Sequence, residues 1–310
     1  MPKNIPTENQ VLGYMKSLSN WGRWGKEDQL GTFNLITPDR VAQAASLVRE
    51  GVTVTCARPI LFENAPDITS IPPLHYMIRA GTEASPTGAG GASDFIGLSF
   101  HGLTVTHLDS LSHQFWDGKM YNGFPANQVT AERGATVGSI DEAKHGVVTR
   151  GVLLDITKVR GVDWLEGGDG VFPDDLEAAE EAQGVHVESG DALLLRLGWF
   201  KRRTELGAVA PSFGRPGLHA AALPWLRERG VSLIAADASQ DVAPSGYNRL
   251  PLPVHSVGIV AMGLWLIDAA NFEELAPVCE RLGRWDFMFM MAPLRLNNTT
   301  GSPVNPLAVF

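Results

Sequence analysis

The chain has 310 residues, of which 44% are hydrophobic and 19% are charged, and it carries a formal net charge of −9. This composition is typical of a globular enzyme domain, and the absence of any Lys/Arg cluster argues against a nucleic-acid partner. Residues 1–10 are polar and lack the apolar segment of a secretion signal, and the longest apolar run, residues 257–267, is too short to cross a membrane. We therefore expect a single domain over residues 1–310, a cytoplasmic location and a small-molecule substrate, with no nucleic-acid or membrane partner.

Cap and turn residues mark three helices in the sequence. Thr37-Pro38 places an N-cap and a first-turn proline at the start of the first helix, and Gly51 ends it. Asn271 and Glu274 have the spacing of a capping box and open the last helix. The helices are therefore expected at residues 37–51, 217–229 and 271–282.

Strands dominate the rest of the chain, as runs of β-branched and apolar residues that turn residues bound. They are expected at residues 53–60, 102–109, 151–157, 191–197, 231–237, 258–267 and 285–296. The strands within residues 151–236 are nearly all apolar, which is typical of strands that are covered on both faces. The Gly-, Ala- and Ser-rich segment 81–94 is expected to be a mobile loop beside a functional site. The sequence thus predicts a mixed α/β fold, in which flanking helices surround a barrel-like, closed or strongly curved central sheet.

One short segment, residues 103–123, carries most of the candidate chemistry. His107, Asp109 and His113 lie within seven residues of an otherwise apolar run. Because side chains alternate along a strand, His107 and Asp109 share a face about 6.6 Å apart, so that both can reach one cation. His113 lies beyond the strand and can curl back over that ion. The two side chains could instead simply hydrogen-bond each other or a backbone carbonyl, but the third histidine and two nearby hydroxyl groups favour a site for zinc, manganese or iron(II).

The motif THLDSLSH, residues 106–113, resembles the T-H-x-D-x-x-x-H core of the cyclase family of metal-dependent hydrolases, which includes bacterial kynurenine formamidases and isatin hydrolases. The resemblance covers most of the chain, because other segments match that family in order: residues 20–39, 150–157, 189–199, 217–241 and 255–275. The motifs NWGRWG and WDGKMYNG resemble a longer, cyclase-like branch. The resemblance implies the swivelling β/β/α type of fold.

The family pattern is H-x-G-T-H-x-D-x-x-x-H, in which the first two histidines and the aspartate bind metal. The resemblance therefore implies that His107 and Asp109 are metal ligands and that His113, the last histidine, is the catalytic acid or base. A later histidine and a glutamate complete the family's site. They correspond here to His255 and to Asp268, whose carboxylate is one methylene shorter.

One position departs from this pattern, because Leu103 stands where the family has its first histidine. His101 is nearby, but on a straight strand it would lie about 20 Å from His107, so we do not expect it to be a ligand. The missing ligand argues against a second metal. A single divalent metal, zinc or manganese, is expected, and the departure leaves open a site that binds none.

The resemblance implies a hydrolase that cleaves an amide, formamide or lactone bond of a small cyclic or aromatic substrate with metal-activated water. Two alternatives stay open: a metal-independent cyclase, dehydratase or isomerase that uses the same His/Asp cluster, and a non-catalytic protein that binds a small molecule. Asp237, at the end of a predicted strand, either takes part in the site or braces its turn. The resemblance also implies a homodimer or homotetramer, with residues 1–36 as an N-terminal extension that packs on the core or on a neighbouring subunit.

Overall fold

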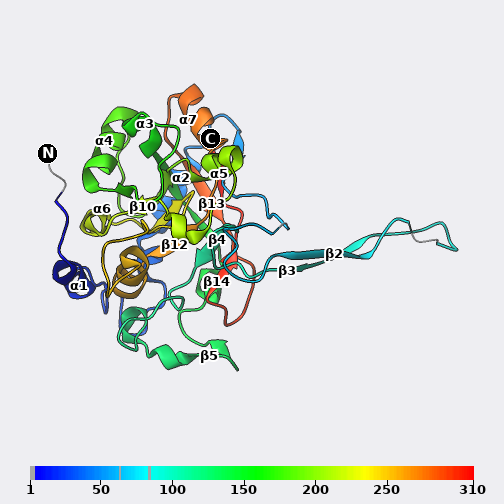
Figure 1. Ribbon diagram of the computed structural model, residues 1–310, viewed down its shortest axis with the longest axis horizontal. Coiled ribbons are helices and arrows are strands. Elements are labelled where there is room, and N and C mark those ends of the chain that lie inside the picture. Colours follow the sequence, from blue (N-terminus) through cyan, green and yellow to red (C-terminus); the bar gives the residue numbers. More distant parts are fainter. Residues whose placement is uncertain (1–3, 63, 83–84) are drawn as a thin grey trace.

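The core of the computed structural model, which describes residues 4–62, 64–82 and 85–310, is a nine-stranded sheet that curls into a half barrel (Figure 1). In sheet order the strands are β1 (Thr53–Thr55), β15 (Leu307–Val309), β13 (Asp286–Met291), β7 (Val147–Asp155), β9 (Ala192–Arg196), β11 (Leu233–Ala236), β12 (Trp265–Asp268), β4 (His107–Asp109) and β14 (Gly301–Pro303). Helices flank this sheet. The predicted mixed α/β fold with a strongly curved central sheet is confirmed.

The centre of the sheet is parallel, and its edges are antiparallel. Strands β7, β9, β11 and β12 run parallel to one another, and Leu153, Leu194 and Ile234 on them are fully buried. This confirms the prediction that the apolar strands between residues 151 and 236 are covered on both faces. Strand β4 pairs antiparallel with β12, in a register that sets His107 opposite Asp268. The sheet therefore brings residues 107 and 268 to one place.

The α-helices pack around the sheet, and several of them were not predicted. They are α1 (Glu8–Ser17), α2 (Pro38–Ala45), α3 (Ile156–Arg160), α4 (Pro173–Gln183), α5 (Trp199–Leu206), α6 (Leu223–Arg229) and α7 (Leu275–Leu282). The predicted helices correspond to α2, α6 and α7, which are shorter than expected. Helix α1 begins with a capping box formed by Thr7 and Gln10, and that spacing could have revealed it. No helix among the described residues is both long and apolar enough to cross a bilayer.

Short helices and strands connect these elements. The 3₁₀ turns are η1 (Gly31–Leu35), η2 (Tyr121–Gly123), η3 (Ala126–Gln128), η4 (Ile140–Ala143), η5 (Pro211–Phe213) and η6 (Ala220–Ala222). The minor strand pairs are β5 (Val129–Thr130) with β6 (Gly134–Ala135), and β8 (Gly170–Val171) with β10 (Gly217–Leu218).

The prediction of a strand over residues 258–267 is wrong in its first half. Val254–Met262 forms a π-helix, η7, and only Trp265–Asp268 is a strand. The carboxylate of Asp241 accepts hydrogen bonds from the backbone N–H groups of Val254 and His255, at 2.6 and 3.1 Å, and thereby caps the first turn. Gly263 ends the helix with a left-handed φ of 65°. A contact from a distant residue thus overrides the local β-propensity of this segment.

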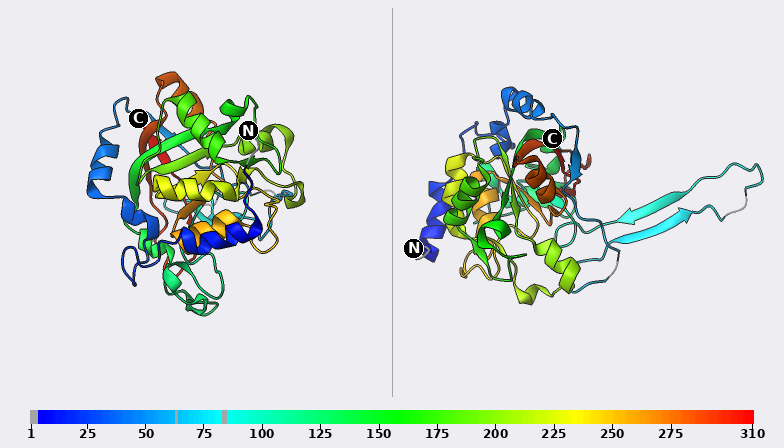
Figure 2. Two further views of the ribbon diagram at one scale, coloured as in Figure 1. Left: turned by 90° about the vertical axis from the view of Figure 1, so that its left-hand side faces the viewer. Right: turned by 90° about the horizontal axis from the view of Figure 1, so that it is seen from above.

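The N-terminal segment lies against this π-helix, as the left panel of Figure 2 shows for α1. The side chain of Asn20 donates to the carbonyl of Met262 at 2.7 Å, and the indole of Trp21 donates to that of Val260 at 2.6 Å. These bonds satisfy carbonyl groups near the end of η7 and attach the described part of residues 1–36 to the core.

A two-stranded hairpin projects far from the body of the molecule (Figures 1 and 2). It consists of β2 (Leu74–Arg79) and β3 (Ser93–Gly97), which pair antiparallel with Leu74 opposite Gly97. The segment 81–94, apart from residues 83 and 84, which lie outside the described residues, is found at the distal end of this hairpin. The prediction that it forms a loop beside the functional site is therefore wrong. We call residues 74–97 the β-arm.

Candidate metal centre

Asp109, on strand β4, is the centre of a cluster of histidines. Its side chain is fully buried, and neither carboxylate oxygen has a hydrogen-bond donor among the described residues. The Nε2 atoms of His107 and His113 lie 3.5 and 3.8 Å from its Oδ1, and Nε2 of His255 lies 3.5 Å from its Oδ2. The predicted residues His107, Asp109, His113 and His255 are therefore brought together, although 142 residues separate the last two.

Two of these imidazoles are oriented by bonds at their other nitrogen. Nδ1 of His107 donates to the carbonyl of Val105 at 2.8 Å, and Nδ1 of His255 donates to the Asp241 carboxylate at 2.5 Å. In the neutral imidazole each bond places the proton on Nδ1, so that Nε2, which is aimed at the cluster, can bind a metal; this is the arrangement of metal-binding histidines in proteins. Asp241 was missed by the sequence reading, although it ends a loop that follows a buried strand.

Asp268 joins the cluster through the register of β12 and β4. Its Oδ2 lies 3.4 Å from Nε2 of His255, and one ligand atom each from His107, Asp109 and Asp268 lie within 4.8 Å of one another. Two donors that bind one zinc ion at tetrahedral angles are separated by about 3.4 Å. The separations around His255 and Asp109 therefore match a shared cation.

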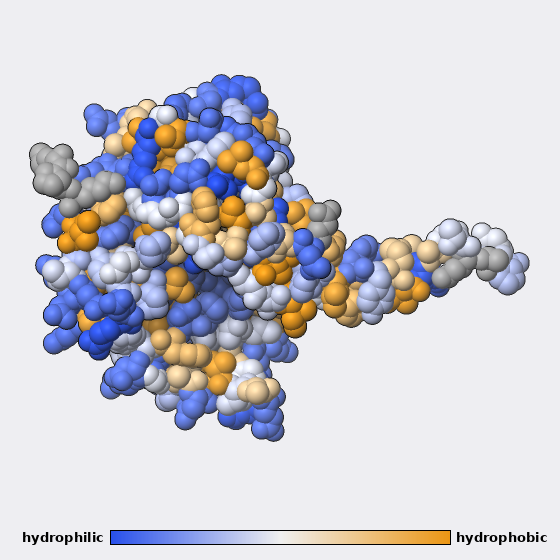
Figure 3. Space-filling model, viewed as in Figure 1, coloured by the Kyte–Doolittle hydropathy of each residue, from blue (hydrophilic) through white to orange (hydrophobic). Residues whose placement is uncertain are grey.

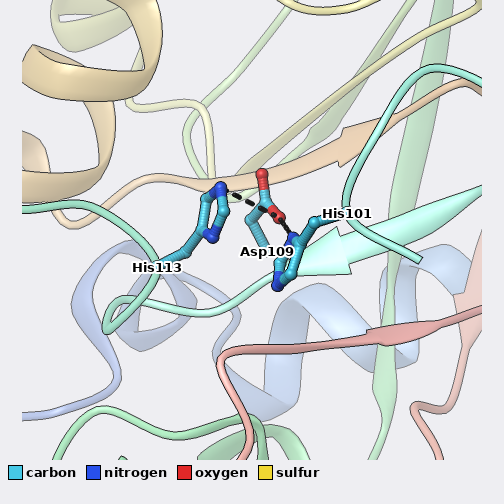
Figure 4. A group of neighbouring side chains, drawn as sticks. All are labelled: His101, Asp109 and His113. Carbon is cyan, nitrogen blue, oxygen red and sulfur yellow. Dashed lines mark ion pairs between the residues drawn. The ribbon is translucent and has the colours of Figure 1, made fainter. Parts of the chain in front are cut away.

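The expectation that His101 lies far from His107 is wrong. Their ring centroids are 5.2 Å apart, because the chain bends at residues 101–105 instead of continuing strand β4. Nδ1 of His101 lies 2.9 Å from Oδ1 of Asp109, and its ring stacks on that of His113 with centroids 4.0 Å apart (Figure 4). The imidazole of His101 thus lies beside Asp109 and can supply the ligand nitrogen that the family pattern expects at position 103, where Leu103 has none.

The geometry of His101 and Asp109 is better explained if both side chains bind one cation than if His101 donates a hydrogen bond to Asp109. Although the two atoms are close, their orientation does not make a hydrogen bond, and Nδ1 of His101 has no other partner within the described residues. His101, Asp109 and His113 form a second group whose ligand atoms lie within 4.8 Å of one another. Asp109 is the member common to both groups.

The electrostatics of the cluster depend on Asp109 and His255. Burial alone would raise the pKa of Asp109, but the nearby imidazoles of His113, His107, His101 and His255 hold that pKa well below its usual range. Burial would lower the pKa of His255, but Asp268, Asp109 and Asp241 raise it well above its ordinary value. Burial dominates for His113 and lowers its pKa to about 4. These shifts therefore favour a charged carboxylate at the centre of the cluster and a neutral His113 imidazole at its edge.

The donor set suits a divalent cation of borderline hardness. Imidazole nitrogens and carboxylate oxygens are the ligands of zinc, manganese and iron(II) sites, and no thiol is close, since Cys56 and Cys279 are buried elsewhere in the core. A bound cation would give the buried oxygens of Asp109 the partner that they lack among the described residues.

Asp237 serves a structural contact rather than the metal cluster. Its carboxylate accepts the backbone N–H groups of Leu197 and Gly198, both at 2.8 Å, and so braces the turn that follows β9. Burial raises its pKa to about 7. Its own carbonyl accepts from Arg58, whose backbone N–H donates in turn to Thr106.

Comparison with known proteins agrees with this geometry. A family model described as "Putative cyclase" matches residues 37–240, well over half of the chain. The chain belongs to the cyclase family. The match includes His107, Asp109 and His113 of the cluster, whereas His255 and Asp268 lie beyond its end.

Solved structures show the same cyclase fold. The crystal structure of a "novel cyclase" is 32% identical to this chain, with a TM-score of 0.86, and the comparison covers 96% of this chain and 99% of that one. Isatin hydrolase A from Labrenzia aggregata, bound to benzyl benzoate, is 22% identical with a TM-score of 0.59, over 86% of this chain and 94% of that one. The enzyme of the same name from Ralstonia solanacearum is 21% identical with a TM-score of 0.58, over 87% and 95%. No functionally curated protein has a significant match to the chain.

Proposed function

We propose that this member of the cyclase family is a metal-dependent hydrolase, which cleaves an amide, formamide or lactone bond of a small cyclic or aromatic molecule. The observation that carries the proposal is the buried carboxylate of Asp109, which has no hydrogen-bond donor in the described part of the chain although four imidazoles surround it. Such a carboxylate is costly to bury unless a positive charge compensates it. The isatin hydrolases with this fold support hydrolysis as the reaction class.

We assign the cation, zinc or manganese, to His107, Asp109, His255 and Asp268. When bound, a divalent cation supplies Lewis acidity toward a carbonyl group and lowers the pKa of water. His113 also belongs to the second donor group, together with His101 and Asp109. It could bind a cation there or transfer a proton, but one nitrogen cannot do both, because a nitrogen that binds a cation cannot carry a proton. Of the four imidazoles, His113 lies farthest from the Asp109 carboxylate, and this separation favours proton transfer as its role.

His113 is suited to move a proton at the edge of the cluster. Because burial lowers its pKa to about 4, its imidazole is neutral near pH 7 and able to accept a proton from the attacking water. Its side chain is 23% exposed, whereas those of His107 and His255 are almost fully buried, so a substrate can reach it more easily than either of them. The same imidazole then delivers the proton to the leaving nitrogen or oxygen.

Elemental analysis tests the proposal directly. Protein purified without chelators is expected to contain about one zinc or manganese ion per chain, and Asp109→Asn is expected to contain almost none, since the amide removes the central charge. Asp94→Asn, which removes an exposed carboxylate on the β-arm, is the matched control and is expected to keep the metal. Wild-type protein that holds no metal after reconstitution with either ion would contradict the proposal.

A second candidate function rests on His255. Its imidazole contacts three carboxylates, those of Asp109, Asp241 and Asp268, and they raise its pKa well above the ordinary value despite its burial. A protonated His255 would compensate the acidic cluster without a cation, which favours a metal-independent cyclase, dehydratase or isomerase that uses acid–base chemistry alone. Full activity in protein dialysed against a chelator would select this alternative.

We also propose that the protein assembles as a homodimer or homotetramer through the β-arm. Leu74, Ile78 and Ile96 on the arm are 51%, 63% and 55% exposed, and Figure 3 shows this apolar surface on the projecting hairpin. A two-stranded hairpin with no third strand or helix against it is marginally stable in water, so a covering partner would stabilise it.

A groove at the base of the β-arm supports a second copy of this chain as that partner. The groove has a volume of about 910 Å³, and most of its lining is apolar, including Ile60, Leu98 and Val304. Ile96 belongs both to the arm and to the groove. The two apolar surfaces are therefore continuous on one chain, and two copies related by a twofold axis can each place an arm against the other's groove.

A further inference from the structure

Arg58 is a buried cation that binds backbone carbonyl groups instead of a carboxylate. The residue is only 5% exposed. Its Nε donates to the carbonyl of Ala270 at 3.1 Å, and Nη1 donates to that of Leu103 at 2.9 Å. Its Nη2 donates to the carbonyl of Asp237, and the guanidinium forms no ion pair within the described residues. Because charge-assisted bonds are strong and the fork of N–H groups is planar and rigid, these bonds fix the carbonyl groups that accept them.

The three carbonyl groups belong to three segments that surround the metal centre. Leu103 lies in the bend between His101 and strand β4. Ala270 lies two residues after Asp268, and Asp237 directly follows strand β11. A single guanidinium therefore joins segments that are far apart in the sequence, close to the places where candidate ligands leave them.

The bend before β4 is the segment that depends most on this contact. No backbone–backbone hydrogen bond to residues 101–105 is found in the part of the chain that the structure describes, because the ladder of β4 begins at His107. The carbonyl of Val105 accepts from the imidazole of His107, which is itself a proposed ligand. The bond from Arg58 to Leu103 thus holds this backbone independently of the cluster.

The other two segments have further support. Asp268 belongs to the ladder between β12 and β4, and its Oδ1 accepts from the backbone N–H of Gln240 at 3.2 Å. Asp241 accepts two backbone N–H groups at the start of η7. Loss of the Arg58 guanidinium is therefore expected to act first on the bend that carries His101.

We propose that Arg58 is a positioning residue of the metal centre, which holds the bend at Leu103 and thereby keeps the imidazole of His101 beside Asp109. Nδ1 of His101 lies 2.9 Å from the Asp109 carboxylate, although the His101 side chain is 27% exposed and has room to turn toward solvent. Residues that orient a ligand typically change metal affinity about 10- to 100-fold. The inference rests on the proposed function, because it treats His101 as a metal ligand.

A double-mutant cycle between residues 58 and 101 tests this role. Arg58→Lys keeps the charge but not the planar fork, and it is expected to lower zinc affinity about tenfold or more in competition with a chromogenic chelator. In the His101→Ala background the same change is expected to have less than about a twofold effect, since the ligand that Arg58 positions is gone. Arg202→Lys changes a buried arginine paired with Glu166, and this matched control is expected to leave the affinity unchanged.

Nitrogen NMR of the imidazole rings in chelator-treated protein follows His101 without a metal. Nε2 of His101 lies 2.9 Å from the hydroxyl of Thr300, so the wild-type ring is expected to give the signals of one tautomer. Arg58→Lys is expected to replace them with signals averaged over both tautomers, whereas those of His75 on the β-arm stay unchanged. The spectrum of His101→Ala identifies the His101 signals.

Two results would overturn the role of Arg58: an equal loss of zinc affinity in both backgrounds, or unchanged His101 ring signals in Arg58→Lys. Arg58→Gln, which has no charge to bury, replaces the lysine variant if thermal unfolding shows that the latter is not folded. A wild type that binds no zinc, with ring signals that still depend on Arg58, would leave the positioning role intact while the hydrolase proposal fails. Zinc binding that is insensitive to Arg58 would do the reverse.

Discussion

At the scale of single residues, the cluster around Asp109 divides into the buried imidazoles of His107 and His255, which we propose as ligands, and the partly exposed imidazoles of His101 and His113. His107 and His255 have their second nitrogen fixed by a carbonyl and a carboxylate, and they have no freedom to move a proton. No hydrogen bond to Nδ1 of His113 is found among the described residues, and its ring stacks on His101. This difference supports the roles that we propose for the ligands and for His113.

Substitution of His113 tests that division. His113→Ala is expected to lower turnover by about 10²- to 10⁴-fold, the usual contribution of a general acid or base, while the metal content stays unchanged. Steady-state rates and elemental analysis of the same preparation check both halves. His75→Ala, on the exposed β-arm, is the control. Loss of metal in His113→Ala would instead make His113 a ligand of the second donor group.

Asp237 leads to a prediction about stability and pH. Because burial raises its pKa to about 7 in the folded chain, whereas an unfolded aspartate titrates near about 3.9, the folded state binds more protons between these values. The free energy of unfolding therefore gains a contribution that is present at low pH and is lost as the pH rises through about 7, at up to about 1.4 kcal/mol per pH unit.

Urea unfolding of chelator-treated protein at several pH values between 5 and 8 measures this contribution. The difference between the wild type and Asp237→Asn is expected to shift in favour of the variant as the pH rises. Asp39→Asn, which changes an exposed carboxylate on α2, controls for the loss of charge. If the free energies of unfolding of the wild type and Asp237→Asn change with pH in parallel, then the Asp237 carboxyl group, which accepts from Leu197 and Gly198, does not titrate in this range.

At the scale of elements, the site depends on one register and one helix cap. The antiparallel pairing of β4 with β12 places Asp268 opposite His107, and a shift by one residue would turn Asp268 to the other face of the sheet. The start of η7 places His255, and Asp241 holds both the backbone and the imidazole of that residue. Asp241 therefore joins the folding of the π-helix to the orientation of His255, a proposed metal ligand.

Asp241→Asn is expected to weaken both functions of that carboxylate. The amide has one acceptor oxygen where the carboxylate has two, so the weakened cap should cost up to about 1 kcal/mol of stability, and the weakened bond that orients His255 should reduce metal affinity about 10- to 100-fold. Chelator competition and thermal unfolding measure the two effects. Asp155→Asn, which keeps an acceptor at the N-cap of α3 but removes the ion pair with Arg196, is expected to lower stability but not metal affinity. Equal metal affinity in Asp241→Asn and the wild type would contradict the orienting role.

At the scale of the whole molecule, the projecting β-arm has no function that a single chain explains, and we propose that it forms the interface between subunits. Its apolar residues are exposed on both faces of the hairpin, so charged substitutions there should not disturb the folded body. Ile78→Glu combined with Ile96→Glu is expected to shift the protein toward monomers in analytical ultracentrifugation, with little change in thermal unfolding of the body. Thr87→Glu, near the tip of the arm, is the control. An assembly that persists unchanged in the double variant would remove the arm from the interface.

The sequence by itself determined the features that depend on neighbours along the chain. Alternation along β4 placed His107 and Asp109 together, apolar runs predicted the buried parallel strands, and caps predicted α2 and α7. The sequence also showed that Leu103 departs from the family pattern, but it did not show that His101 reaches the cluster instead. These features follow from local geometry and local hydrophobicity, which the sequence records directly.

Only the tertiary structure decided what depends on distant partners. The bend before β4 brings His101 to Asp109, and the Asp241 carboxylate turns an apolar, β-prone segment into the π-helix that carries His255. The β-arm also has no signature in sequence spacing. In each case a long-range hydrogen bond, a charge or a missing partner outweighs local propensity, because the energy of such a contact depends on where the rest of the chain has packed.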